Sequence, residues 1–411
     1  MVIANIDPLM AVDIPHGWDL IPLGKCVSEK LSYGVNAPAI SYNRCYPCYI
    51  RITDITEDGQ YDDSDKKSVA ITCEEKERYS LKVGDIVLAR TGASTGKSYL
   101  YNEEDGELVY AGFLIKAAVN VRSYNPRFVF GQLRTRRYWT WVAATSMRSG
   151  QPGINGKEYA AFLIPIAPKK EQDKIAETLL KFDTYIDDLT ELIEKKRGIR
   201  EGVLEDLMSG RTRLKGFVDN WQNEKLLNHV QLVQGLTYTP EDVSISGTLV
   251  LRSSNIQNKR LSLEDNVYVR TSVPHEKMIC AGDILICVRN GSADLIGKNC
   301  VLPDLINTTF GAFMSVLRGD TTGFIAKVFD SSIVQEQVRS RTSATINQIT
   351  KKDFESIMIP WPSEDEQKAI ASVLATMDEE IETLEIERDK MIQIREGAMD
   401  DLLTGRVRLS V

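Results

Sequence analysis

Histidine and long apolar runs are both scarce in this 411-residue sequence. Its three histidines, His16, His229 and His275, stand far apart in the chain. Acid–base and nucleophilic catalysis rely on histidine more than on other side chains, so no catalytic constellation is evident. No apolar run approaches the roughly 18 residues that would span a bilayer. Both absences argue against a histidine-dependent enzyme and against a membrane-embedded protein.

Cysteine is also in short supply. The seven cysteines are an odd number without the spacing of a disulfide framework, which favours reduced thiols in a cytoplasm. Cys45 and Cys48 form a C-x-x-C pair, but there is no second pair, and histidines are too few to complete a zinc site. The N-terminal segment carries Asp7 and no basic stretch, so it does not resemble a signal peptide. We therefore expect a cytoplasmic protein without a bound metal.

The segment Gly92–Ser98 resembles a phosphate-binding loop only superficially. It has three residues between its glycines, where that motif requires four. A related segment, Gly291–Asn299, has five. Because a nucleotide-binding loop would not vary in this way, we expect no cofactor on this chain. We interpret both segments as basic turns that touch a DNA backbone, with a plain surface turn as the alternative.

An internal repeat is the strongest feature that the sequence does contain. Residues 199–214 reappear as residues 394–409, and segments 165–214 and 360–409 share 20 of 50 positions without gaps. The upstream halves match more loosely. A GDI motif begins at Gly84 and again at Gly282. The chain is thus organised as variable, constant, variable and constant segments.

Each constant segment carries apolar residues four and three positions apart, the pattern of a coiled-coil seam. From about residue 169 to 209 such a helix would be roughly 60 Å long. Gly210 and Gly405 stand where a left-handed residue would end each helix. An amphipathic helix lying on its own domain is the alternative, but two such seams most simply bury each other. The predicted seam residues are Ile175, Leu179, Phe182, Ile186, Leu189, Ile193, Ile370, Leu374, Met377, Ile381 and Leu384.

A chain that repeats itself is expected to fold with an internal pseudo-twofold axis, as homodimers do. The axis would make the two long helices antiparallel and place the variable domains at opposite ends. Short β-rich runs with glycine-bearing turns, and helical stretches near 126–147 and 323–341, predict mixed α/β variable domains. The predicted domains are 1–165 and 215–360, and the predicted helical spacers are 166–214 and 361–411.

The net charge of −8 is unevenly distributed along the chain. Residues 364–411 hold 13 acidic and 6 basic residues, so the rest of the chain is nearly neutral. Residues 116–157 contain eight basic residues and no acidic one, and residues 337–352 contain four basic residues and no acidic one. An uninterrupted basic face is suited to phosphate contact, although a solvated helix face is the alternative. Its recurrence in both repeats favours DNA binding.

The repeated helices end in an L-x-D-L-x-x-G-R signature at Leu204–Arg211, matched by Met399–Arg406. Each helix is entered through a proline-bearing passage that ends in Glu-Gln, at Ile164–Gln172 and Ile359–Gln367. Together with the GDI motifs, these features resemble the specificity subunit of type I restriction-modification enzymes. The resemblance extends over essentially all 411 residues.

This resemblance implies a non-catalytic subunit that binds double-stranded DNA. Each variable domain would be a target-recognition domain that reads one half of a bipartite, asymmetric site, and the coiled coil would set the spacer. Two modification subunits would carry S-adenosylmethionine and methylate adenine. Motor-nuclease restriction subunits, which use ATP and Mg, could join them.

Basic residues of the acid-free stretches and of the turns beside the GDI motifs are the predicted DNA contacts. Arg134, Arg136 and Lys97 are expected to position the backbone, and Arg148 and Gln151 to read bases. The complete predicted set is Arg51, Arg90, Lys97, Arg134, Arg136, Arg137, Arg148, Gln151, Arg252, Arg289, Lys298, Arg339, Arg341 and Lys351.

Two other functional classes compete with this interpretation. A coiled-coil adaptor would bind only proteins, and its variable domains would show no salt-dependent affinity for duplex DNA. A stand-alone nuclease or methyltransferase would need motifs that the sequence lacks. An activity assay on the single chain separates this last class from the others.

Overall fold

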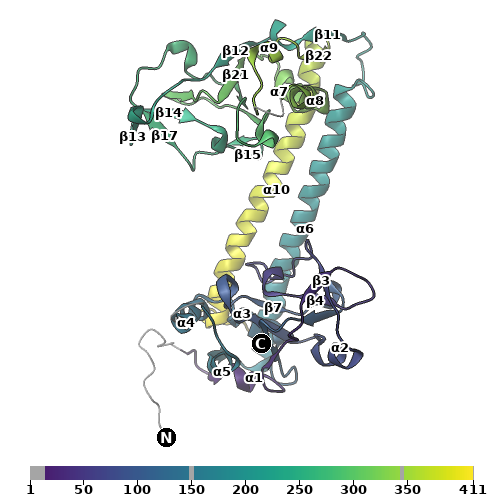
Figure 1. Cartoon of the computed structure of the whole chain (residues 1–411), viewed down its shortest axis with the longest axis vertical. Coiled ribbons are helices and arrows are strands. Elements are labelled where there is room, and N and C mark those ends of the chain that lie inside the picture. The colour runs from purple at the N-terminus through teal and green to yellow at the C-terminus, as the bar shows by residue number, and fades with distance from the viewer. Residues whose placement is uncertain (1–13, 148–151, 343–346, 411) are drawn as a thin grey trace. The chain divides into compact units, whose positions relative to one another are not determined.

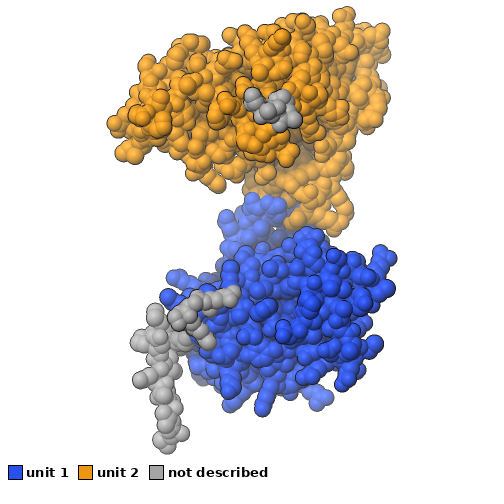
Figure 2. Space-filling model, in the orientation of Figure 1, with its two compact units in different colours: residues 1–189, 387–411 blue, residues 190–386 orange. Residues whose placement is uncertain are grey.

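The computed structural model describes residues 14–147, 152–342 and 347–410 (Figure 1). The chain forms two compact units, unit 1 with residues 1–189 and 387–411 and unit 2 with residues 190–386 (Figure 2). The division passes through both long helices. Each unit therefore contains one globular domain together with one part of each long helix.

The two long helices are α6 (Lys169–Met208) and α10 (Glu364–Thr404), with 40 and 41 residues. The glycine beyond each helix is left-handed, with φ of +70° at Gly210 and +71° at Gly405. Glycine adopts this conformation without a Cβ penalty, which is why it ends helices. Both helix ends confirm the expectation from the repeated glycine.

Each domain contains, among its described residues, two four-stranded sheets with the same strand order. The strands of unit 1 are β2 (Ser32–Tyr33), β3 (Ala39–Ser41), β4 (Cys48–Ile50), β5 (Lys67–Val69), β6 (Asp85–Ala89), β7 (Ser98–Leu100), β8 (Leu108–Tyr110) and β9 (Leu114–Ala118). Their orders are β2-β9-β6-β7, in which all pairs are antiparallel, and β3-β5-β4-β8, in which β4 and β8 are parallel.

Unit 2 repeats this plan strand for strand. Its strands are β12 (Gln231–Gln234), β13 (Val243–Ser244), β14 (Thr248–Leu251), β17 (Val267–Val269), β18 (Ile284–Cys287), β19 (Asn299–Val301), β20 (Thr308–Phe310) and β21 (Met314–Arg318). They are ordered β12-β21-β18-β19 and β13-β17-β14-β20, and β14 is parallel to β20. Unit 2 also has a hairpin of β15 (Ile256–Gln257) and β16 (Arg260–Leu261).

An antiparallel strand pair lies next to the start of each long helix. These pairs are β1 (Asp19–Pro22) with β10 (Leu163–Ile166), and β11 (Gln222–Lys225) with β22 (Met358–Trp361). The shorter helices are α1 (Leu23–Cys26), α2 (Cys73–Tyr79), α3 (Pro126–Gln132), α4 (Arg136–Ser146), α5 (Gly156–Ala161), α7 (Phe324–Asp330), α8 (Ser332–Arg341) and α9 (Lys351–Phe354). The mixed α/β class and the helical stretches near 126–147 and 323–341 are confirmed.

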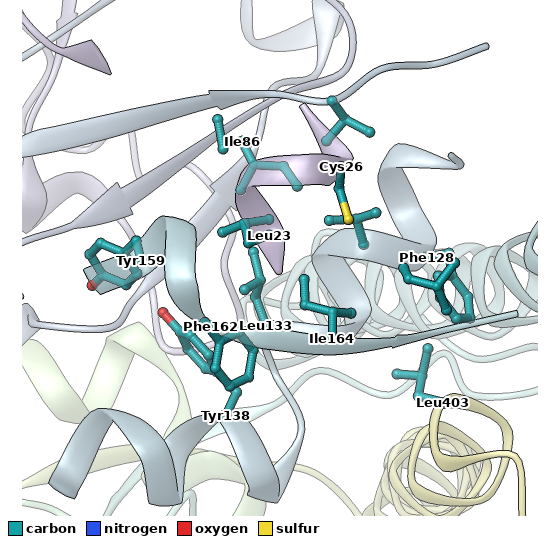
Figure 3. Packing of buried hydrophobic residues seen from close by; sticks show 14 of the residues in the cluster. Leu23, Cys26, Ile86, Phe128, Leu133, Tyr138, Tyr159, Phe162, Ile164 and Leu403 are labelled. Carbon is teal, nitrogen blue, oxygen red and sulfur yellow. The ribbon is translucent and has the colours of Figure 1, made fainter. Parts of the chain in front are cut away.

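The main core of unit 1 includes the last turns of α10. Figure 3 shows Leu403 beside the buried side chains of the domain, such as Phe128 and Ile164. A Cβ on Gly131 would lie 3.0 Å from Leu403, and the Gln132 side chain donates a hydrogen bond to the Leu403 carbonyl at 2.7 Å. The end of α10 is therefore part of this domain's interior.

The main core of unit 2 includes the last turns of α6 in the same manner. Leu204, Leu207 and Met208 are buried in one cluster with Phe324 and Phe329 of α7. Burial of such side chains stabilises the fold by about 1.5–3 kcal/mol each. In both units the apolar end of a repeated helix thus completes a domain core.

A buried carboxylate holds the helix end in unit 1. Glu171, in the first turn of α6, is 1% exposed. It accepts two hydrogen bonds from Arg408, at 2.6 and 2.7 Å, and one from the indole N–H of Trp18 at 3.1 Å. Arg408 also donates to the His16 carbonyl at 2.9 Å. This carboxylate therefore joins the start of α6 to the C-terminal segment and to the start of the domain.

The repeat-related residues form the same cluster in unit 2. Glu366, also 1% exposed, accepts hydrogen bonds from Arg213 at 2.6 and 2.8 Å and from the Trp221 indole at 2.8 Å. Arg213 donates to the Asp219 carbonyl at 2.9 Å. The Glu-Gln motif recognised in the sequence thus supplies the anchor in both repeats.

Further along the helices, a second reciprocal ion pair joins the two helices in each unit. Arg395 of α10 contacts Asp183 of α6 at 2.5 Å in unit 1, and Arg200 of α6 contacts Asp378 of α10 at 2.8 Å in unit 2. The two pairs correspond in the internal repeat: Arg200 and Arg395 are 195 residues apart, and so are Asp183 and Asp378. Because the residue numbers rise along α6 as they fall along α10, the helices run antiparallel within each unit.

The residues of the predicted seam are all buried or half-buried. Ile175, Leu179 and Phe182 belong to or pack on the main core of unit 1, and Ile370 and Leu374 belong to that of unit 2. The seam residues nearest each domain thus serve the domain core. Met377 also packs on the main core of unit 2. The others lie further along the helices: Ile186, Leu189, Ile193, Ile381 and Leu384.

Removal of the anchoring arginine should loosen unit 1. We expect Arg408→Ala to lower the free energy of local opening by about 2 kcal/mol, because the buried Glu171 carboxylate loses its cation. Amide hydrogen exchange in peptides covering 14–26 and 169–176 should accelerate roughly 30-fold. The control is Arg406→Ala, an ion-paired arginine whose side chain is 63% exposed, which should change the free energy by less than about 0.5 kcal/mol. Equal effects of the two variants would contradict this role of Glu171.

The same anchor predicts an acid-sensitive unit 1. Hydrogen bonds from Arg408 hold the pKa of Glu171 below its ordinary value. A carboxylate whose pKa is lower in the folded state stabilises the fold above its unfolded-state pKa and loses this contribution as the pH falls. Exchange in these unit 1 peptides should therefore accelerate on acidification in the wild type. In Glu171→Gln this component of the pH dependence should be absent.

Candidate nucleic-acid interface

The GDI motif forms the buried start of the central strand in each domain. Gly84 is left-handed, with φ of +91°. Asp85 accepts a hydrogen bond from the backbone N–H of Lys82 at 2.9 Å, and Asp283 accepts one from Cys280 at 2.8 Å. Both carboxylates are at most 5% exposed, and burial raises the pKa of Asp85. The motif therefore positions the strand, whose residues are buried, and the chain reaches the surface only after the strand, at Arg90 and Arg289.

An arginine follows the central strand in each domain and stacks on an aromatic ring. The guanidinium of Arg90 lies 4.9 Å from the ring centroid of Tyr33, and that of Arg289 lies 5.1 Å from the ring of Phe313. Neither arginine forms an ion pair with any residue that the structure describes. Stacking orients the guanidinium and leaves its charge available to an anionic ligand.

The glycine-rich turn beyond Arg90 is shaped by packing. A Cβ on Gly96 would lie 2.7 Å from Val142 of α4, and the Gly96 carbonyl accepts a hydrogen bond from Tyr138 at 2.7 Å. Lys97 contacts Glu57 at 2.7 Å. The absence of a side chain at Gly96 therefore lets α4 pack against the turn. The charge of Lys97 is balanced by Glu57. In unit 2, Lys298 donates to the Ser253 carbonyl at 3.5 Å.

The loop that follows α4 in unit 1, and the loop that follows α8 in unit 2, lie next to this turn. Thr91 forms a β-bridge with Gly153, and Arg289 forms one with Gln348. The structure therefore brings together the GDI turn and the loop that the sequence singled out for base reading. The two predicted base readers in this loop, Arg148 and Gln151, lie outside the described residues.

Arg51 and Arg252 hold their own domains together. Arg51 donates to Asp54 at 2.6 and 2.8 Å and contacts Asp65 at 3.2 Å. Arg252 contacts Asp265 at 2.7 Å. Both arginines tie a turn after the parallel strand to a neighbouring loop. Their predicted part in DNA contact would require these pairs to be shared with phosphate.

The basic segment of unit 1, which precedes and begins α4, contains half-buried and exposed arginines. The side chain of Arg134 is 15% exposed, lies 3.7 Å from Asp58, and lines a cavity of about 400 Å³ with Asp183 and Arg395. Arg137 donates to the Leu163 carbonyl at 2.7 Å. Burial lowers the pKa of both arginines. Arg136, at the start of α4, is exposed.

Unit 2 shows a similar division. Arg341 donates to Ser356 at 2.8 Å and to the Gln337 carbonyl at 2.8 Å, so it joins α8 to the segment before β22. Arg339 and Lys351 are exposed and form no ion pair with the described residues. Among the predicted contacts of this domain, Arg289, Arg339 and Lys351 are exposed and form no ion pair with the described residues.

Three aromatic side chains at this surface were not among the predicted contacts. Tyr33 is 42% exposed, Phe113 57% and Phe313 56%. A lone aromatic residue in a β-rich run is indistinguishable from a core residue by composition. Alignment of the two GDI regions would have paired Phe113 with Phe313, but it would not have shown their exposure.

Other kinds of site find little support in the described part of the chain. Cys45, Cys48 and Cys73 line a cavity of about 550 Å³. Within the described ranges, however, no three histidine, cysteine, aspartate or glutamate side chains are grouped as metal ligands. None of the described helices is long and apolar enough to cross a membrane.

Comparison with known proteins identifies the family. The model of the type I restriction modification DNA specificity domain matches residues 39–197 and 281–393. A Methanocaldococcus jannaschii protein assigned as the type I restriction enzyme MjaX specificity subunit is 26% identical, over 97% of this chain and 95% of its own length. The EcoKI specificity subunit of Escherichia coli K12 is 29% identical, over 46% of this chain and 43% of its own length.

A solved structure shares the fold. It is the S subunit of a type I restriction-modification system from M. genitalium, with a TM-score of 0.59 and 16% identity, covering 96% of this chain and 97% of that one. The family model covers more than half of this chain. These findings confirm the resemblance inferred from the repeated helices. The chain belongs to the type I restriction-modification DNA specificity family.

Proposed function

We propose that this chain is the DNA-recognition subunit of a type I restriction-modification complex, and that each unit reads one half of a bipartite, asymmetric site. One observation carries the proposal. The two domains share their strand order and helix anchors but present different side chains around the same turn. Where unit 1 has Tyr33 and Thr91, unit 2 has Gln234 and Arg289. A shared scaffold with divergent surface residues suits two different half-sites.

The long helices support a spacer function. Each is a single unbroken helix that begins at one domain and ends in the core that contains the other helix's start. The distance between the half-sites would follow from the number of helical turns. The ends are fixed because Glu171 and Glu366 anchor them.

The predicted cations that form neither an ion pair nor a side-chain hydrogen bond with the described residues are the proposed phosphate contacts. In unit 1 these are Arg90 and Arg136, and in unit 2 they are Arg289, Arg339 and Lys351. The other predicted cations whose side chains the structure describes have partners within their own unit. Phosphate contact by Arg51, Lys97, Arg134, Arg137, Arg252, Lys298 or Arg341 would have to compete with those partners.

We propose that the helices also dock two modification subunits. Leu192 and Ile199 of α6 and Ile386 and Ile394 of α10 are each at least 41% exposed. Apolar residues on an otherwise charged helix surface are suited to a helical partner. In this proposal S-adenosylmethionine is held by the modification subunits, and ATP and Mg by restriction subunits. The chain itself recognises DNA and carries no cofactor.

A protein-only adaptor is the competing proposal. Titration of the full chain with its modification subunits against duplex DNA, at several salt concentrations, separates the two. A DNA-recognition subunit should lose affinity steeply as salt rises, because phosphate contacts release counterions. Absence of any salt-dependent affinity would favour the adaptor.

Exchange of one domain should change one half of the methylated site. If residues 1–165 are replaced by the corresponding domain of another family member, the half read by unit 2 should stay the same. Sequencing of methylated sites in a host that carries the hybrid measures both halves. A change in both halves, or in neither, would contradict independent reading.

Lengthening the helix should lengthen the spacer. Insertion of four residues near Thr190 adds about one turn, or 6 Å, to α6. The tolerated spacer should grow by roughly one or two base pairs at 3.4 Å each. The matched control variant carries the same insertion in both helices, near Thr190 and Glu385, which keeps their pairing. An unchanged spacer in both variants would show that the helices do not set it.

Salt dependence should separate accessible arginines from those engaged within the domain. Arg90→Ala and Arg136→Ala should each lower the salt slope of DNA binding by about one and weaken all sequences alike. Arg51→Ala should leave the slope unchanged and instead lower thermal stability, because it breaks the pair with Asp54. A lower slope in Arg51→Ala would return that residue to the interface.

A further inference from the structure

A phenylalanine occupies the same exposed position in both domains. Phe113 is 57% exposed and Phe313 is 56% exposed. Each lies in a four-residue turn before a buried strand, β9 or β21. The turn is closed by a backbone hydrogen bond of 2.8 Å, from Leu114 to Ala111 in unit 1 and from Met314 to Gly311 in unit 2. The two turns are thus built alike.

Folding does not account for these two rings. The residues that follow them, Leu114 and Met314, are buried in the domain cores, whereas the phenylalanine rings keep more than half of their surface in water. Apolar surface stabilises a fold only when it is removed from water. A single exposed apolar residue is ordinary. Two at one turn, in domains whose surfaces otherwise diverge, point to a shared purpose.

The surroundings of each ring are those of a DNA-binding surface. The Phe113 carbonyl accepts a hydrogen bond from the Arg90 backbone at 3.0 Å, and the Phe313 carbonyl accepts one from Arg289 at 3.2 Å. Arg289 also stacks on the Phe313 ring, at 5.1 Å from its centroid. In unit 1, Arg90 stacks instead on Tyr33. In unit 2 an exposed ring lies beside an exposed guanidinium, and in unit 1 an exposed ring lies beside the backbone of a half-buried arginine. Apolar rings next to cationic side chains fit a nucleic acid, whose bases are apolar and whose backbone is anionic.

We propose that Phe113 and Phe313 make apolar contacts with bases, each in the half-site that its own domain reads. This inference rests on the proposed function and adds residues that determine specificity. The neighbouring arginines would hold phosphates, and the rings would contact a thymine methyl group or a base step. Such contacts contribute to affinity without releasing counterions.

The test uses the full chain in complex with its modification subunits. The probe is a duplex that carries the site mapped by methylation sequencing, and binding is titrated at several salt concentrations. Phe113→Ala should weaken cognate binding by about tenfold and leave the salt slope unchanged. The complex that carries this variant should discriminate less against single mismatches, and only in the half-site that unit 1 reads. Phe313→Ala should do the same in the other half.

Three further variants keep the result interpretable. Phe113→Trp retains an aromatic face and should retain affinity. Val121→Ala in unit 1 and Ile306→Ala in unit 2 remove apolar side chains that are 52% and 95% exposed elsewhere in the same domains. They should change neither affinity nor discrimination. Arg90→Ala should lower the salt slope, which distinguishes a phosphate contact from a ring contact.

Replacing thymine by deoxyuridine in one half-site distinguishes the two modes of contact. If the ring touches a methyl group, the substitution should weaken wild-type binding, and Phe113→Ala should add nothing to that loss. If the ring stacks on a base step, the two losses should be independent.

Unchanged affinity and discrimination in Phe113→Ala and Phe313→Ala, with a wild type that binds the probe, would overturn the inference. A wild-type complex without salt-dependent binding would instead overturn the proposed function.

Discussion

The fold depends on one buried carboxylate in each unit. Glu171 and Glu366 are each 1% exposed, and each is neutralised by an arginine that lies beyond the end of the other long helix. A buried carboxylate without a cation is strongly unfavourable, so detachment of the helix end from the domain would destabilise the fold. In unit 2 the arginine and the tryptophan of the cluster, Arg213 and Trp221, are eight residues apart in sequence. In unit 1 the same contacts join Arg408 to Trp18, near opposite ends of the chain.

The contact between the end of one long helix and the start of the other explains why the repeat extends to both helix ends. Leu403 completes the core of unit 1, and Leu207 completes the core of unit 2. Each domain core therefore depends on the C-terminal end of one long helix. The middle part of each long helix can then differ in length while the anchored ends stay the same. A chain with anchors at both ends and a uniform coil between them can vary its length by whole turns. The same property makes such a helix suitable as a spacer.

The long helices, their glycine stops and the class of the domains followed from the sequence because periodicity and repetition report them directly. The helix anchors did not. The signature motif draws attention to Arg211 and Arg406, whose side chains are at least 63% exposed, whereas the arginine two residues further on holds the buried carboxylate. Which arginine is buried depends on the domain that packs against the helix end. No spacing along one chain contains that information.

The basic stretches show the same limit for the interface. Eight basic residues without an acidic neighbour in sequence suggest an open positive face, yet Arg134 meets Asp58 and Arg137 meets a carbonyl after folding. Among the predicted contacts whose side chains the structure describes, those without an ion pair or a side-chain hydrogen bond to another described residue are Arg90, Arg136, Arg289, Arg339 and Lys351. Position in the sequence therefore does not tell which arginines can reach an anionic ligand, because the partners that folding brings to each guanidinium decide it. The net charge of −8 misleads in a similar way, because residues 364–411, with 13 acidic and 6 basic residues, carry most of it and the rest of the chain is nearly neutral.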